Sequence, residues 1–171
     1  MYTLVFRFLL VFACFMPQAS TAQFISATLG LNGLTCSMCS LGIQSELEKL
    51  PFVENVTLNL NTNIANILFK VNEKVDMRAV VGAVYKAGFS LGYTEADYIF
   101  HQLPVSNQSV FSYEGETYEF LKPSVAIANG RTTLKFIDKK FIAKKGYSFW
   151  APLIKESLNG KTDPTTYHIT L

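Results

Sequence analysis

Between residues 24 and 93, apolar positions recur with two different spacings that alternate along the chain. Stretches in which every second residue is apolar predict half-buried strands, and stretches with a spacing near 3.6 residues predict helices. The resulting order is strand, helix, strand, strand, helix, strand, a split βαβ unit in which two helices cover one sheet. The strands are predicted over residues 24–31, 53–60, 64–71 and 89–93, and the helices over 37–49 and 76–87.

Residues with strong local preferences mark the ends of the two predicted helices. Pro51 ends the first helix because a proline has no N–H to donate and clashes with the preceding turn. Asp76 can cap the start of the second helix, and Gly88 is typical of the residue that stops one. The apolar face of the first helix is expected to comprise Leu41, Ile43, Leu47 and Leu50.

The second half of the chain predicts a small β-rich domain, such as a partly open barrel, and matches no family that we recognise. A boundary is expected near residues 93–97, beyond which the chain holds neither cysteine nor methionine. We therefore expect residues 23–94 to fold as a unit with its own core, and residues 95–171 to form a second domain of unknown function. Strands are predicted over 98–103, 109–121, 132–142 and 165–171, and a helix over 149–158 with Pro152 in its first turn; the predicted turns include Gly115, Asn129–Gly130 and Gly146.

The first 22 residues are typical of a targeting segment. Residues 1–16 form an apolar run with a single charged residue, Arg7, and small residues precede a predicted cleavage point after Ala22. The protein is then exported to the periplasm or cell envelope, and the mature chain begins at Gln23. The alternatives are an anchor that is never cleaved and a lipid attached at Cys14.

Composition and charge exclude several classes of protein. Of the 171 residues, 49% are hydrophobic, which is too many for a disordered chain. A formal net charge of +2 does not favour a nucleic-acid partner. Beyond residue 16 there is no run of about 18 apolar residues, so we expect no membrane span in the mature chain.

Two cysteines carry the candidate chemistry. After cleavage only Cys36 and Cys39 remain, spaced as C-x-x-C. In an exported protein such a pair forms a disulfide, a redox pair or a metal site that is loaded or kept reduced.

The surroundings of this pair resemble the heavy-metal-associated domain. Residues 33–39, GLTCSMC, are similar to the G-M-T-C-x-x-C loop of that family, which includes copper chaperones, N-terminal modules of metal-pumping P-type ATPases and periplasmic mercury-binding proteins. Residues 50–53 and 87–89 also resemble family turns, so the likeness covers about residues 26–93. It implies a ferredoxin-like α+β sandwich, followed here by the small β-rich domain, with Cys36 and Cys39 as metal ligands and Phe89 as an aromatic residue that shields the loop.

The resemblance implies that the protein binds a soft metal ion and hands it over. Cu(I) is the expected ion and Hg(II) or Zn(II) are alternatives, because thiolates select soft metals. Two ligands leave open positions that a partner's thiolates can enter, so a metal-donor or metal-acceptor protein with a thiolate loop is expected, such as a membrane metal transporter. We find no catalytic triad, paired acid–base carboxylates or phosphate loop, and we expect no enzyme activity.

Other interpretations of the same residues stay open. The cysteine pair also suits a thiol–disulfide redox or thiol-sensing protein, and the metal site could be vestigial in an interaction module. Met38 is a further soft atom inside the loop, more typical of a solvent-facing filler than of a ligand. His101 and His168 are isolated in sequence and are expected at surface or interface positions. The pairs Lys139–Lys140 and Lys144–Lys145 suit a solvated face or an acidic partner.

Overall fold

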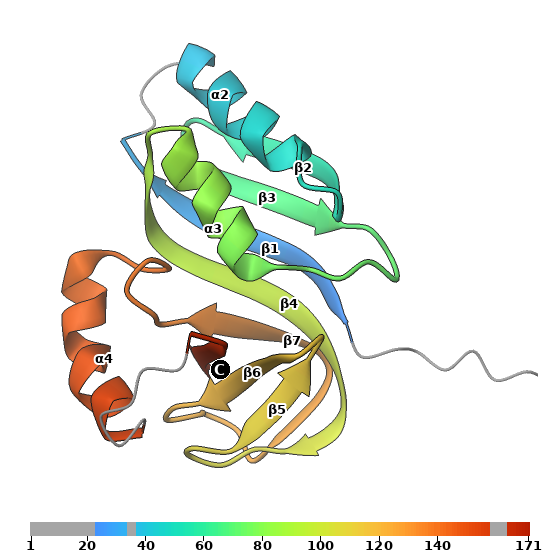
Figure 1. Ribbon diagram of the computed structural model, residues 1–171, viewed down its shortest axis with the longest axis vertical. Coiled ribbons are helices and arrows are strands. Elements are labelled where there is room, and N and C mark those ends of the chain that lie inside the picture. The colour runs from blue at the N-terminus through green and yellow to red at the C-terminus, as the bar shows by residue number, and fades with distance from the viewer. Residues whose placement is uncertain (1–22, 34–36, 158–163) are drawn as a thin grey trace, which may run out of the picture.

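The computed structural model describes residues 23–33, 37–157 and 164–171 (Figure 1). Its first six elements follow the predicted order of strand, helix, strand, strand, helix and strand, which confirms the α+β, ferredoxin-like βαββαβ prediction. In chain order the elements are β1 (Phe24–Asn32), α2 (Ser37–Glu48), β2 (Val53–Asn59), β3 (Ile64–Phe69), α3 (Met77–Lys86), β4 (Ser90–Pro104), β5 (Val110–Tyr113), β6 (Glu116–Phe120), β7 (Ile127–Phe136), α4 (Lys144–Ser157) and β8 (Thr166–Thr170).

All the strands belong to one sheet with the order β2-β3-β1-β4-β7-β8-β6-β5. Most neighbours are antiparallel, and β6 and β8 pair in parallel. Figure 1 shows α2 and α3 side by side over one face of the strands β1 to β3, while α4 packs against the second half of the chain. Among the described residues no helix covers the opposite face of β1, β3 and β4, which is the open face of the sheet.

Local signals position the two helices that lie over the first half. The Asp76 carboxylate caps α3 by accepting hydrogen bonds from the Arg78 and Ala79 amides at 2.8 and 3.1 Å. Gly88 follows with φ of +89°, the left-handed conformation that stops a helix at little cost in glycine. In α2, Ile43 and Leu47 are fully buried, but Leu41 is 64% exposed, so its predicted place on the apolar face is wrong. Leu41 is two residues from Ile43, which turns it to nearly the opposite side of the helix.

β4 crosses the region in which the sequence predicted a boundary. Its 15 residues join what we predicted as two strands, 89–93 and 98–103, into one. One edge of β4 pairs with β1 from Ser90 to Tyr98, and the other pairs with β7 from Thr94 onward. Both halves thus share one sheet, and the division into residues 23–94 and 95–171 stays a prediction.

A cluster of aromatic rings continues from β1 into the second half of the chain. The ring of Phe24 lies 4.9 Å from that of Tyr98, 5.2 Å from Tyr113 and 5.7 Å from Tyr118, measured between centroids. Burial raises the pKa of Tyr98 to about 12. Because aromatic side chains bury large apolar areas, these contacts stabilise the start of β1 against the strands that follow β4.

The second half follows the prediction at one turn and departs from it at others. The predicted turn at Gly115 is present, because Glu114 and Gly115 both have positive φ, and it divides the predicted strand 109–121 into the hairpin of β5 and β6. The predicted turn at Asn129–Gly130 lies inside β7, where Gly130 has φ of +65° and the register with β4 shifts nearby. The last helix starts earlier than predicted, so it includes Gly146 and places Pro152 in its interior.

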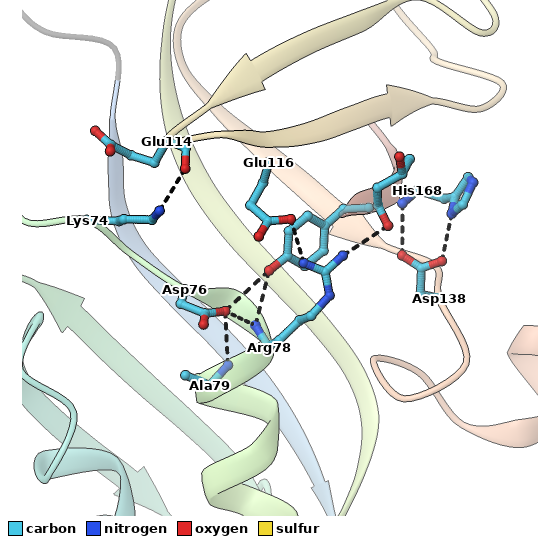
Figure 2. A network of polar contacts seen from close by, with 10 residues as sticks. Lys74, Asp76, Arg78, Ala79, Glu114, Glu116, Asp138 and His168 are labelled. Carbon is cyan, nitrogen blue, oxygen red and sulfur yellow. Dashed lines mark hydrogen bonds and ion pairs between the residues drawn. The ribbon is translucent and has the colours of Figure 1, made fainter. Parts of the chain in front are cut away.

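The start of α3 is tied to strands of the second half (Figure 2). The Arg78 guanidinium donates to the Glu116 carboxylate at 2.7 Å and to the Thr166 carbonyl at 3.1 Å, and it stacks 3.8 Å above the centre of the Tyr167 ring. Nearby, the Lys74 ammonium donates to the Glu114 carbonyl at 2.7 Å. These contacts fix α3 against β6 and β8.

On the open face of the sheet, Asp97 joins three strands. Its carboxylate accepts hydrogen bonds from Ser26 on β1 at 2.9 Å and from Thr133 on β7 at 2.6 Å, and Arg131 of β7 donates to it at 2.6 and 3.0 Å. Burial alone would raise the pKa of Asp97, but the hydrogen bonds from Thr133, Arg131 and Ser26 outweigh burial and lower it below 3.8.

Asp97→Asn is expected to lower the free energy of unfolding at neutral pH by about 1 kcal/mol, because the amide loses the charge that these donors stabilise. A carboxylate with a lowered folded-state pKa stabilises the protein above its unfolded-state value of 3.8, and that stabilisation is lost as the pH falls through the folded-state pKa. Urea unfolding of both proteins at about pH 7 and about pH 2.5 checks this. A difference of the same size at both pH values would contradict the electrostatic explanation.

Candidate metal site

The candidate site lies where β1 ends and α2 begins. Asn32, the last residue of β1, pairs with Ser90, and its side-chain amide lies 3.5 Å from the Ser90 hydroxyl. Gly33 then takes φ of +83°, a conformation that residues with a side chain rarely adopt. The backbone thus turns sharply out of the sheet at the first residue of the predicted loop.

The helix that follows the loop favours an anionic ligand group at its start. Cys39 is the third residue of α2, within the first turn, where backbone N–H groups lack intrahelical partners. The first turn contains no acidic residue, so no carboxylate competes for these amides or for the positive end of the helix dipole. Such a position stabilises a thiolate relative to a thiol.

The predicted ligand pair is only partly within the described structure. Cys36 lies outside the described residues, and Cys39 is described by its backbone alone. The assignment of Cys36 and Cys39 as metal ligands stays a prediction. Met38 also falls in the part of α2 whose side chains are not described.

Phe89 lies at the same end of the sheet as the loop. Phe89 directly precedes Ser90, which pairs with Asn32 at the end of β1. Its side chain is half-buried and packs against the core, and the turn at Gly88 sets its position. Figure 1 shows the end of β1, the start of α2 and the end of α3 at this one end of the molecule. This location agrees with the predicted shielding role, which itself stays a prediction.

An ion-pair cluster joins the last turn of α2 to α3. The Glu46 carboxylate of α2 accepts from Lys49 at 2.5 Å and from Lys86 of α3 at 2.8 Å. Hydrogen bonds from Lys49 and then Lys86 lower the pKa of Glu46. Because two ammonium groups already occupy this carboxylate, it is poorly placed to act as an oxygen ligand.

The two histidines are not part of this site. His101 is exposed on β4, as predicted. His168 is 3% exposed, so its predicted surface position is wrong: its amide and its Nδ1 bond both oxygens of Asp138, at 2.8 and 2.7 Å. Among residues 23–33, 37–157 and 164–171, no group of three or more His, Cys, Asp or Glu side chains could hold a metal ion.

A known protein family matches the region that contains the candidate site. Residues 28–90 match the family model of the heavy-metal-associated domain. The match confirms the resemblance predicted from the sequence.

Several known proteins are similar to part of this chain. A copper-transporting ATPase of Helicobacter pylori is 30% identical over 98 residues, which is 57% of this chain but only 11% of the ATPase. The chain thus spans about a ninth of that relative. Among solved structures, the CopZ metallochaperone is 20% identical with a TM-score of 0.37 and covers 39% of this chain and 97% of its own. Oxidized MerP from Ralstonia metallidurans CH34 is 23% identical with a TM-score of 0.35, and the match covers 42% of this chain and 97% of the MerP chain.

Within the described part of the chain, no helix combines the length and the hydropathy that crossing a membrane requires.

Proposed function

We propose that this protein binds Cu(I) through the thiolates of Cys36 and Cys39 and passes the ion to a partner protein, without catalysing a reaction. The observation that carries the proposal is the match of residues 28–90 to the heavy-metal-associated family model, in a stretch that contains the C-x-x-C sequence at the start of α2. Thiolates are soft ligands and favour Cu(I), while Hg(II) and Zn(II) are the ions that would compete with it. The similarity to a copper-transporting ATPase supports copper over the other two.

The small number of ligands favours transfer over storage. A structural zinc site closes around four protein ligands. Here the loop offers two cysteines, and the nearest carboxylate on α2 that is described in detail is held by two lysines. A thiolate of the partner can therefore coordinate the bound ion before the ion dissociates from this protein. The ion then passes through a shared intermediate, much as thiol–disulfide exchange passes through a mixed disulfide.

The proposal includes the location and the partner. The apolar segment before Ala22 directs export, so the ion is handled in the periplasm or cell envelope, and cleavage leaves a chain that begins at Gln23. The partner is a protein with its own thiolate loop, such as a membrane metal transporter, and the copper-transporting relative supports this class.

Stopped-flow transfer tests the proposal. Protein verified as dithiol and loaded with Cu(I) is mixed with an acceptor that carries a similar C-x-x-C loop, and the transfer rate is expected to rise with acceptor concentration. The matched control is a chelator of equal affinity that is too bulky to enter the loop, and it is expected to remove the ion only at the slower rate of spontaneous release.

Two outcomes would contradict transfer by shared coordination. If acceptor and chelator remove the ion at the same concentration-independent rate, release is dissociative and the protein sequesters copper. If the dithiol protein binds no Cu(I) but cycles its disulfide with a test substrate, the cysteine pair serves redox chemistry. Competition with Hg(II) and Zn(II) in the same assay identifies the preferred ion.

A further inference from the structure

A large cleft in the described part of the chain lies between α3, α4 and the segment that follows β7, and its lining includes none of the predicted metal ligands. It has a volume of about 860 Å³. Clefts that bind small molecules usually measure about 300 to 1,000 Å³ and are mostly apolar with a few polar groups. Its apolar lining comes from Val81 and Tyr85 on α3, Phe141 after β7, and Tyr147 and Ile154 on α4.

Positive charge gathers at the edge of this cleft. Lys139 and Lys140 line it and are exposed, and neither ammonium has an ion-pair partner within the described residues. The hydroxyl of Tyr85 donates to the Lys140 carbonyl at 3.2 Å, which holds the lysine segment against α3. The two lysines that the sequence singled out are thus fixed beside an apolar surface.

The acidic groups near the cleft are already paired. The Asp138 carboxylate is hydrogen-bonded to both the amide and the Nδ1 of His168, as Figure 2 shows. The Glu116 carboxylate forms an ion pair with the Arg78 guanidinium at 2.7 Å. These carboxylates leave the two lysine ammonium groups available to a ligand. An apolar cleft of limited size with unpaired cations at its edge is complementary to a small molecule that has an apolar body and an anionic end.

We propose that this cleft binds a small amphipathic carboxylate, a molecule with an apolar chain and one carboxylate group. The chain lies against Val81, Phe141 and Ile154, and the carboxylate lies at Lys139 and Lys140. The size of the cleft favours a small molecule over a folded partner. The proposal is independent of copper binding, because the cleft contains none of the metal-site residues.

Calorimetric titration of the purified protein with dodecanoate tests the proposal, at concentrations below micelle formation. Dodecylammonium has the same chain with the opposite charge and serves as the matched ligand. Saturable one-to-one binding of dodecanoate, with much weaker binding of dodecylammonium, is expected. Lys139→Gln with Lys140→Gln is expected to weaken dodecanoate binding by about five- to tenfold. Lys135→Gln, an exposed lysine on β7 outside the cleft, is the control and is expected to leave binding unchanged.

A second pair of variants tests the apolar space of the cleft without changing the core. Gly82 lines the cleft, and a Cβ built there meets no atom within 4 Å. Gly82→Leu is expected to abolish dodecanoate binding by occupying the apolar space, whereas Gly82→Ala is expected to retain it. Both substitutions replace glycine within a helix by a better helix former, so both variants should remain folded by circular dichroism.

Several results would overturn the proposal. They are a lack of saturable binding by the unmodified protein, equal binding of the two ligands, and binding that survives Gly82→Leu. Capture of an apolar peptide in place of dodecanoate would show that the cleft serves a protein partner instead.

Discussion

Cys36→Ser and Cys39→Ser are each expected to weaken Cu(I) binding by more than about 100-fold, because each removes one of two ligands and even outer-shell changes cost about 10- to 100-fold at metal sites. Serine keeps the size of cysteine but offers a hard, protonated oxygen in place of a soft thiolate. The measurement is Cu(I) affinity by competition with a chromophoric ligand, under reducing conditions.

The fold should survive both substitutions. Serine is well tolerated at the start of a helix, and the core of this region is built from residues elsewhere, such as Ile43 and Leu47. Far-UV circular dichroism of each variant is therefore expected to match that of the unmodified protein. Met38→Leu is the matched control, since it removes the other soft atom of the loop and is expected to leave the affinity nearly unchanged. Tight Cu(I) binding that persists in either serine variant would contradict the assignment of Cys36 and Cys39 as the ligands.

The order of the first six elements could be predicted because each is signalled within its own residues. Asp76 and Gly88 act on the nearest turn of backbone. In β1 and β3 apolar and polar residues alternate, because successive side chains of a strand point to opposite faces of the sheet. The C-x-x-C loop is likewise a local feature, so its family could be predicted from a short stretch of sequence.

The continuity of β4 could not be predicted, because the reason for it lies on another strand. Glu95 and Asp97 interrupt the apolar pattern and look like the polar residues of a linker. In the structure Asp97 is held by Ser26 of β1 and by Arg131 and Thr133 of β7, which are distant in sequence. A charged residue inside a strand is stable here because its partners come from both neighbouring strands.

The cleft and the buried histidine depend on the same kind of distant pairing. His168 and Asp138 are separated by 30 residues, and only the pairing of β7 with β8 brings their chain segments together. No local pattern distinguishes Asp138 from an exposed carboxylate. Arg78 of α3 and Thr166 of β8 likewise meet only after the sheet has formed.

A fragment of residues 23–94 is expected to have a free energy of unfolding about 3 kcal/mol or more below that of residues 23–171, and to bind Cu(I) equally well. The fragment 23–94 loses the pairs of β1 with β4 from Thr28–Glu95 to Phe24–Tyr98. Phe24, which is 2% exposed in the whole chain, also loses the rings of Tyr98, Tyr113 and Tyr118. The pairing of Asn32 with Ser90 beside the metal loop is retained, because it lies at the other end of β1.

Urea unfolding and Cu(I) titration of the fragment and of the chain from residue 23 to 171 separate stability from function. Phe24→Ala in the longer chain is the matched variant: it removes the same aromatic contacts, costs about 3 to 5 kcal/mol, and should also retain the metal. A fragment as stable as the longer chain would show that the two parts fold independently despite the shared strand. A folded fragment that binds no Cu(I) would show instead that residues 95–171 complete the site, since the loop and the start of α2 are present in both proteins.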